Sequence, residues 1–381
     1  MARPAIYLDH NAASPLLPEA RAVLFTALNL TGNPSSVHGH GRLLRNAMET
    51  GRDQVAKLAG AERNQVVFTS SASEAITQAI VAGSRTFKVS RIITTAGEHS
   101  AVTKASESTG LPVTVIGLDA NGVIEVAQLA AAVAAADAAG EIALVAVHSV
   151  NNETGVVQPM AAVSALVGPT KHYLFVDAVQ SLGKQELEFA ASAPDMMAIS
   201  GHKIGATAGI GALLMKSHAD TVRLIPGGGQ EQGRRGGTEA AAQIAAFGAA
   251  AADFSQRYQR ANIGALVAQL EGGLRALAPN AVIFGEAAER IGNVVNFAVP
   301  ELTNAVAMMG LDLLGISVSS GSACSSGKVG RSHVLAAMGV SPELADCALR
   351  VSLGWNSTAG DVNAFLTGFE TVLTRQRSRA A

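Results

Sequence analysis

The sequence predicts an α/β fold, in which a large domain built on a mostly parallel sheet is followed by a smaller α+β domain. Short apolar runs alternate with helical patterns through the first two-thirds of the chain. This alternation is typical of a parallel sheet with helices on both faces. The pattern then changes to a long helical region followed by separate strands and helices. The chain has 381 residues, 48% of them hydrophobic, which is enough for two cores.

Five short apolar runs predict the buried strands of the large sheet. They are residues 66–69, 91–94, 143–147, 174–176 and 196–199. Helical patterns lie between them at residues 41–59, 73–82 and 125–139. Ligands of such sheets bind beyond the carboxyl ends of the strands. Because Asp177, Lys203 and His148 lie near such ends, we expect a site there.

The C-terminal third predicts a different arrangement. A Gly-rich segment, residues 226–233, interrupts the alternation, and one long helical region runs from Thr238 to about Leu277. Strands are then expected at 293–299, 316–319 and 349–353, and helices at 303–310 and 361–375. We therefore expect an N-terminal arm at residues 1–15 that packs on the small domain, a large domain at 16–254 and a small domain at 255–381.

Composition and charge exclude several classes of partner. The net charge is -2 and no basic run occurs, so neither nucleic acid nor a membrane surface is expected. The N-terminus lacks the apolar run of a signal peptide, and the Ala-rich residues 126–139 are too short to span a bilayer. The two cysteines are expected to be free thiols, and no ligand spacing predicts a metal. We therefore expect a cytoplasmic protein with its specificity in a pocket.

Lys203 and Asp177 are the two groups that pyridoxal phosphate chemistry needs. Lys203 ends the motif Ser-Gly-His-Lys just past a predicted strand, and Asp177 ends the preceding strand. A lysine forms a Schiff base with this cofactor, and a carboxylate keeps its pyridine nitrogen protonated. Gln180 is placed to donate to the phenolate oxygen of the ring. Taken singly, a surface lysine, a turn aspartate or a solvated glutamine is an adequate interpretation, but together they favour the cofactor site.

A helix start rich in hydroxyl groups predicts the phosphate site. Residues 69–74 turn from a strand into a helix, and the N–H groups at a helix N-terminus attract anions. The same residues fit a capping box, which is a purely structural role. Both roles are compatible, so Ala72 and Ser73 are expected to face the phosphate. Ser200 and His202 are expected to approach it from the other side.

Three more residues complete the predicted pocket. His99 follows a strand and offers an aromatic plane over the pyridine ring, in a chain with only 4% Phe, Trp and Tyr. Asn152 follows another strand and offers a polar contact to the ring or to a substrate. Arg350 lies in a strand-like run, where it needs an anionic partner. That partner is either a substrate α-carboxylate or a structural Asp or Glu, and the sequence leaves both open.

Cys324 indicates the reaction. It lies among small residues with no apolar periodicity, from Ser320 to Gly327, so an exposed thiol is expected, and its reactivity depends on the thiolate fraction. A mobile thiol beside a Schiff-base lysine points to removal of sulfur from an amino acid. Cys347 lies on a helical pattern and is expected to be structural.

These motifs resemble those of the cysteine desulfurases of the nitrogen-fixation and iron–sulfur-cluster type, within the aminotransferase class V group. The resemblance covers nearly the whole chain. It is carried by residues 7–13, 32–38, 150–155, 227–238 and 350–354, together with the Asp177 strand, the Lys203 loop and the Cys324 loop. The Cys324 loop is similar to that of the long mobile-loop branch of the family.

The resemblance implies the fold-type I architecture of pyridoxal phosphate enzymes, with a seven-stranded sheet, and a homodimer with its sites at the subunit interface. It implies conversion of L-cysteine to L-alanine, with the sulfur passing as a persulfide on Cys324 to an acceptor protein for iron–sulfur cluster or other thio-cofactor biosynthesis. It assigns Asn152 and Arg350 to the substrate, and Thr238 to the phosphate in the partner subunit's site. It gives His99 a catalytic role beside Lys203 and Cys324.

Two alternatives remain open at the level of the sequence. The first is a selenocysteine lyase on the same scaffold. The second is a non-catalytic scaffold protein of a sulfur pathway. The identity of the sulfur acceptor is open as well.

Overall fold

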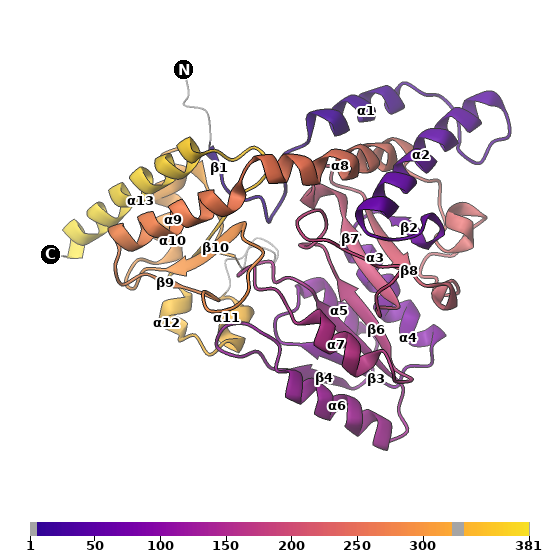
Figure 1. Cartoon of the computed structure of the whole chain (residues 1–381), viewed down its shortest axis with the longest axis horizontal. Coiled ribbons are helices and arrows are strands. Elements are labelled where there is room, and N and C mark those ends of the chain that lie inside the picture. Colours follow the sequence, from indigo (N-terminus) through magenta and orange to yellow (C-terminus); the bar gives the residue numbers. More distant parts are fainter. Residues whose placement is uncertain (1–5, 322–330, 381) are drawn as a thin grey trace.

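The computed structural model describes residues 6–321 and 331–380, and its centre is a seven-stranded sheet (Figure 1). The strands are β2 (Val66–Thr69), β3 (Arg91–Thr95), β4 (Val113–Ile116), β5 (Ala143–His148), β6 (Tyr173–Asp177), β7 (Met196–Ser200) and β8 (Gly211–Met215). Their order across the sheet is β2-β8-β7-β6-β5-β3-β4. The pairs from β7 to β4 are parallel, whereas β8 is antiparallel to both β7 and β2.

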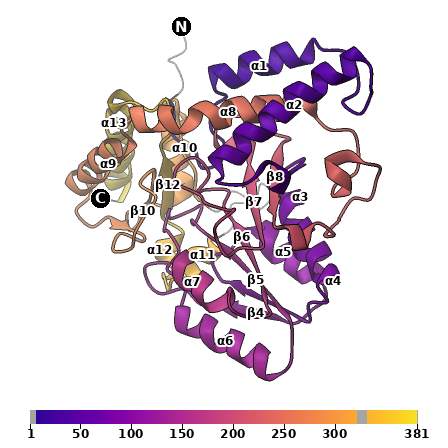
Figure 2. The ribbon, with the colours of Figure 1, turned by 45° about the vertical axis from the view of Figure 1, so that its right-hand side comes forward.

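Helices cover both faces of this sheet (Figures 1 and 2). One face carries α2 (Gly39–Leu58), α6 (Val126–Ala138), α7 (Met160–Val167) and α8 (Ala241–Arg260), with α1 (Pro18–Leu28) against α8. The other face carries α3 (Ala72–Thr77), its continuation through a π-helix (Gln78–Ala82) into α4 (Gly83–Thr86), and α5 (Ser100–Ser108). Along β5, Val145 and Val147 join the first core, and Leu144 and Ala146 join the second. Burial on both faces explains why the strands read as nearly continuous apolar runs.

A three-stranded antiparallel sheet lies in the C-terminal part. Its strands are β9 (Val282–Ile283), β10 (Val294–Ala298) and β12 (Ala348–Ser352). The longer helices around it are α9 (Ile263–Leu277), α10 (Asn304–Asp312) and α13 (Ala359–Ala380), and α11 (His333–Ala337) and α12 (Pro342–Ala345) are short. A separate apolar core includes Phe297, Phe365 and Phe369. The predicted fold class is therefore confirmed, while the domain boundaries after residues 15 and 254 stay a prediction.

The N-terminal segment links the two sheets. Strand β1 (Ile6–Tyr7) pairs in parallel with β11 (Ile316–Ser317) beside the C-terminal sheet. A few residues later, the N–H of Ser14 donates to the carbonyl oxygen of His202 at 2.8 Å. Residues 8–13 therefore cross from the C-terminal sheet to the loop that carries Lys203.

Some elements differ from the prediction. β4 and β8 were not predicted as separate strands, because β4 is an edge strand with Val113 and Val115 exposed and β8 opens with Gly211. The prediction of one helical region from Thr238 to Leu277 was wrong, because α8 and α9 are separate helices. They part at Asn262, whose φ of 49° is left-handed, a conformation that asparagine tolerates better than most residues. No helix within residues 6–321 and 331–380 is long and apolar enough to cross a membrane.

Helices α2 and α8 pack closely at a glycine. A Cβ atom added to Gly51 would lie 2.6 Å from the carbonyl oxygen of Ile244 on α8. Backbone atoms on both helices would have to move to admit it. Gly51 therefore sets how closely α8 lies over the sheet.

We predict that Gly51→Ala lowers the free energy of unfolding by about 1–3 kcal/mol through overpacking, as measured by urea unfolding. Gly272→Ala is the matched control, because Gly272 is exposed on α9 with no atom within 4 Å of an added Cβ. Alanine there is expected to be neutral or to stabilise by up to about 1 kcal/mol. A Gly51→Ala protein as stable as the unmodified chain would contradict the close packing.

Candidate active site

A cavity of about 270 Å³ lies beyond the carboxyl ends of β5, β6 and β7. Its volume is near the lower end for small-molecule pockets, which begin at roughly 300 Å³. Eight predicted site residues line it: Ala72, Ser73, His99, Asn152, Asp177, Gln180, His202 and Lys203. Within residues 6–321 and 331–380, no three His, Cys, Asp or Glu side chains are grouped to hold a metal ion.

Lys203 enters the cavity from a short 3₁₀ turn after β7. Its Nζ donates to the carbonyl oxygens of Asn11 at 2.6 Å and Ala12 at 2.9 Å. The turn begins at Gly201, where an added Cβ would lie 2.9 Å from the side chain of Ile210. The compact turn therefore needs glycine, and it presents the amine to the N-terminal segment.

Asp177 is the last residue of β6 and is buried. Burial raises the pKa of Asp177, and the N–H of Val179, which donates to Oδ1 at 3.0 Å, partly offsets this. The positive charge of a protonated His99 or His148 would also lower it. The position suits a carboxylate that shares a proton with a basic ligand atom, because burial strengthens such an interaction.

A buried pair, Glu98 and His148, lies next to Asp177. Glu98 Oε1 is 2.7 Å from His148 Nδ1 and accepts from Thr95 Oγ1 at 2.6 Å. Burial lowers the pKa of His148, but the negative charge of Glu98 and a contribution from Asp177 leave it raised overall. His148 Nε2 and Glu98 Oε2 are buried without hydrogen-bond partners among the described residues. The pair therefore places at the carboxyl end of β5 an imidazole whose pKa is raised above its ordinary value.

Gln180 lies between a donor and an acceptor. Its Nε2 donates to the carbonyl oxygen of Asn11 at 3.1 Å, and its Oε1 accepts from Nζ of Lys184 at 2.9 Å. Burial, followed by repulsion from Lys203 and Arg350, lowers the pKa of Lys184 to about 7. The amide is thus held with its nitrogen on the side of the N-terminal segment.

The predicted phosphate site lies at the start of α3. Ser71 Oγ caps the helix by accepting from the N–H of Glu74 at 3.2 Å, so the predicted cap is present. Ala72 and Ser73 occupy the first turn, where N–H groups have no partner within the helix. Opposite them, Ser200 Oγ lies 2.9 Å from Nδ1 of His202, although Ser200 itself does not line the cavity.

His202 and His99 differ in their environment. Burial, and then the charge of Lys203, lowers the pKa of His202 to about 4, so its imidazole is neutral. His99 caps α5 by accepting from the N–H of Ala101 at Nδ1, at 3.1 Å. This contact fixes the ring at the edge of the cavity and places the proton of the neutral form on Nε2.

Arg350 is buried on β12 and has an acidic partner. Its Nη2 donates to Asp9 Oδ1 at 2.7 Å, and its Nη1 donates to the carbonyl oxygen of Asn152 at 3.1 Å. Its Nε has no hydrogen-bond partner among the described residues. Of the two partners that the sequence left open, the structural carboxylate is therefore present, and a role toward the substrate stays a prediction.

Thr238 lies outside the cavity that contains Lys203. It is exposed and lines a separate cavity of about 130 Å³, together with Ser70 and Arg235. Arg235 binds Glu74 on α3, with Nε 2.8 Å from Oε1. The predicted contact of Thr238 with the partner subunit's site stays a prediction.

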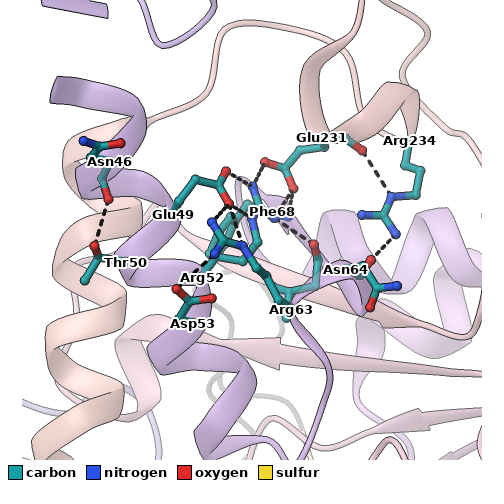
Figure 3. Close-up of polar contacts among 11 residues, drawn as sticks. Asn46, Glu49, Thr50, Arg52, Asp53, Arg63, Asn64, Phe68, Glu231 and Arg234 are labelled. Carbon is teal, nitrogen blue, oxygen red and sulfur yellow. Dashed lines mark hydrogen bonds and ion pairs between the residues drawn. The ribbon is translucent and has the colours of Figure 1, made fainter. Parts of the chain in front are cut away.

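The segment that leads to Thr238 is anchored by a buried ion pair (Figure 3). Glu231 accepts from Nη1 and Nη2 of Arg52 at 2.8 and 2.7 Å, and from the N–H of Phe68 at 2.9 Å. Glu231 and Gln232 have φ of 46° and 57°, which are left-handed values that cost energy in non-glycine residues. The ion pair holds this turn against α2 and β2.

The structure describes only one of the two cysteines. Cys324 lies outside the described residues. Cys347 is buried, its Sγ is 3.4 Å from the carbonyl oxygen of Glu343, and burial raises its pKa. Cys347 is thus a protonated thiol with a structural environment.

Residues on either side of 322–330 lie beside the same carboxyl group, that of Glu153. Glu153 Oε2 accepts from Ser332 Oγ at 2.6 Å, and a Cβ added to Gly321 would lie 3.3 Å from the same oxygen. Burial raises the pKa of Glu153. Both flanks are therefore held beside the turn that follows β5.

Several residues of the site were missed by the sequence reasoning. Asn11 lies in the motif at residues 7–13 and Glu98 directly precedes His99, but neither was assigned a role, and Lys184 lies outside every motif that was considered. The signal for Lys184 was its place four residues after Gln180, within reach across a turn. Glu98 gave no comparable signal, because an acidic residue in a loop is normally solvated.

Comparison with known proteins gives a consistent result. The family model described as aminotransferase class-V matches residues 6–365. Cysteine desulfurase 2 of Trichormus variabilis is 36% identical over 380 residues, which cover 98% of this chain and 94% of that protein. Cysteine desulfurase NifS of Azotobacter vinelandii is 32% identical over 381 residues, with the same coverage. The solved structure of a NifS-like protein from Rickettsia africae aligns with a TM-score of 0.86 at 31% identity, over 97% of this chain and 99% of that one.

We predict that Glu98→Gln lowers the pKa of His148, because only the smaller contribution of Asp177 then opposes the effect of burial. A raised folded-state pKa contributes stability that is complete below the ordinary value of 6.5 and is lost as the pH rises through the folded value. The variant should therefore lose about 2–4 kcal/mol at pH 6 and less at higher pH. Urea unfolding across this range and NMR titration of the imidazole measure both effects.

Glu107→Gln serves as the control for that substitution. Glu107 lies on α5 and pairs with Lys104 at the surface, at 2.8 Å. Its removal should change stability by less than about 0.5 kcal/mol at any pH. An unchanged His148 titration in Glu98→Gln would show that the carboxylate does not hold the imidazolium.

Proposed function

The chain belongs to the aminotransferase class-V family, and on this premise we propose that it uses pyridoxal phosphate, held at Lys203, to take the sulfur from L-cysteine. The relatives that it matches over 98% of its length are cysteine desulfurases, and the chain is an enzyme of this kind. The observation that carries the proposal is that Lys203, Asp177 and His99 meet in one cavity.

The residues of the cavity fit this cofactor. Its chemistry requires an amine, an acid partner for a ring nitrogen and an anion site, and Lys203, Asp177 and the start of α3 supply them around 270 Å³ of space. When bound, the cofactor supplies an electron sink for the carbon next to the amino group of the substrate. We assign the phosphate to Ala72, Ser73 and His202 of the lining and to Ser200, which contacts His202, and the ring to the remaining lining residues.

Asp177 and the histidines control protons at the ring. Asp177 would hold a proton between its carboxylate and the pyridine nitrogen. A protonated His148, whose Nδ1 is 2.7 Å from Glu98, would favour the ionised form of Asp177 and would oppose part of the effect of burial. His99 would lie over the ring and confine it from one side.

Lys203 is assigned the proton transfer. In the proposed reaction its Nζ would take the α proton of the substrate and return it later. The carbonyl oxygens of Asn11 and Ala12, at 2.6 and 2.9 Å from Nζ, orient the amine for this task. A base held by two acceptors needs little reorganisation.

Arg350 and Asn152 are assigned to the substrate. In the structure Arg350 binds Asp9, and a substrate α-carboxylate would compete with this side chain for the guanidinium. The buried Nε without a partner supports an additional acceptor at this position, because an unsatisfied buried donor is costly. The guanidinium would then orient the amino acid with its sulfur away from the carboxylate.

Cys324 is assigned the sulfur transfer. Its thiolate attacks the sulfur of L-cysteine, so that an S–S bond forms while the substrate C–S bond breaks. The carbon fragment keeps the electron pair, gains a proton and leaves as L-alanine. The enzyme retains a persulfide, which an acceptor protein takes for iron–sulfur cluster or other thio-cofactor biosynthesis. A homodimer, in which Thr238 serves the partner's site, is part of the same proposal.

We predict that Lys203→Ala abolishes covalent capture of the cofactor. After reduction with borohydride, the unmodified chain should carry one pyridoxyl group on Lys203 by mass spectrometry, because only a lysine imine is trapped. Lys104→Ala, which removes an exposed lysine paired with Glu107, should behave like the unmodified chain. A pyridoxyl group found on another lysine would refute the assignment.

We predict that Cys324→Ala retains the cofactor absorbance but loses sulfide release from L-cysteine by more than about 100-fold, because the nucleophile is gone. Cys347→Ala is the matched control and should stay active, since its thiol is buried. Alanine and sulfide are measured together, with L-selenocysteine in parallel to test the lyase alternative. A cofactor-loaded chain that releases neither product would overturn the desulfurase proposal.

A further inference from the structure

Lys184 is a half-buried lysine that the proposed chemistry does not use. It lies in the turn after β6, where Gly183 has a φ of 73°. A Cβ added at Gly183 would lie 2.7 Å from the ring of Phe254. The turn therefore reverses the chain and returns Lys184 to Gln180, four residues earlier.

The contact between these side chains has a definite direction. A backbone carbonyl only accepts hydrogen bonds, whereas the Nζ of a lysine donates them in both its charged and its neutral form. Lys184 Nζ lies 2.9 Å from one end of the Gln180 amide, and the carbonyl oxygen of Asn11 lies 3.1 Å from the other. With both neighbours present, only one orientation of the amide satisfies them. Its oxygen must face Lys184, and its nitrogen must face Asn11.

We propose that Lys184 is a positioning residue that fixes the amide of Gln180, so that Nε2 keeps one hydrogen available to donate into the cavity. This inference rests on the proposed function, in which the acceptor is the phenolate oxygen of pyridoxal phosphate. Asn11 uses one of the two hydrogens of Nε2. The second is free for a ligand only while the oxygen end is held by Lys184.

The charged groups around Lys184 do not stabilise its positive charge. Lys203 and Arg350 repel it. Burial lowers the pKa of His10 to about 4, and the charge of Lys184 adds to this effect. No acidic side chain within the described residues forms an ion pair with it. A lysine held at such a cost of burial and repulsion needs a compensating contact, and the amide oxygen supplies it.

The test uses the cofactor-loaded protein and the pH at which its visible absorbance changes. A hydrogen bond donated to the phenolate oxygen competes with the proton of the lysine linkage, so its loss raises this midpoint. Lys184→Met should raise it by roughly one pH unit, a tenfold change in proton affinity. Lys184→Arg keeps a donor and should restore the wild-type value. Lys216→Met is the control, since Lys216 donates to Ala190 outside the cavity.

A double-mutant cycle separates positioning from a direct effect of charge. Gln180→Leu removes the amide, so adding Lys184→Met to it should produce no further shift. An equal shift in both backgrounds would show that Lys184 acts by charge alone, and it would overturn the inference. No shift in Lys184→Met would do the same.

Two measurements keep the test decisive. Thermal unfolding shows whether each variant folds. If Lys184→Met does not fold, Lys184→Gln takes its place, because glutamine is also uncharged and too short for the same contact. Failure of the unmodified chain to bind pyridoxal phosphate would overturn the proposed function and this inference with it. Normal binding with no effect of Lys184 would overturn the inference alone.

Discussion

The carbonyl oxygen of Asn11 is the point on which the site depends. It accepts from Nζ of Lys203 and from Nε2 of Gln180. The residue is held from behind, because its N–H donates to Ser352 Oγ at 2.9 Å and its side chain donates to the carbonyl oxygen of Asn152 at 3.1 Å. A buried carbonyl group needs such partners. One residue of the N-terminal segment thereby joins the lysine loop, the turn after β6 and the C-terminal sheet.

The electrostatics of the site follow from burial. Asp177, Glu98 and His148 are taken out of water at the ends of adjacent strands, where a charge is stable only beside its complement. Glu98 and His148 pair through Oε1 and Nδ1, and Asp177 retains capacity for a basic ligand atom. At the far side, Arg350 is balanced by Asp9. The cavity is therefore charged in a pattern that an anionic molecule with a basic ring nitrogen complements.

The sequence predicted most of the fold and the centre of the site, because both follow from where apolar strands end. Lys203 and Asp177 were recognisable since each follows a short buried run, and the capped start of α3 was recognisable from Ser71. Lys184 and Glu98 were not, because the burial of a charged side chain depends on tertiary packing that local pattern does not encode. The break at Asn262 was missed for a related reason: a single left-handed residue leaves the apolar periodicity on both sides intact.

The carboxyl group of Glu153 has a consequence for how this chain tolerates change. Gly321 and Ser332 both lie against it, so one side chain from the turn after β5 helps to set where both residues lie. A change at Glu153 would therefore disturb both positions at once, although they lie in separate parts of the sequence.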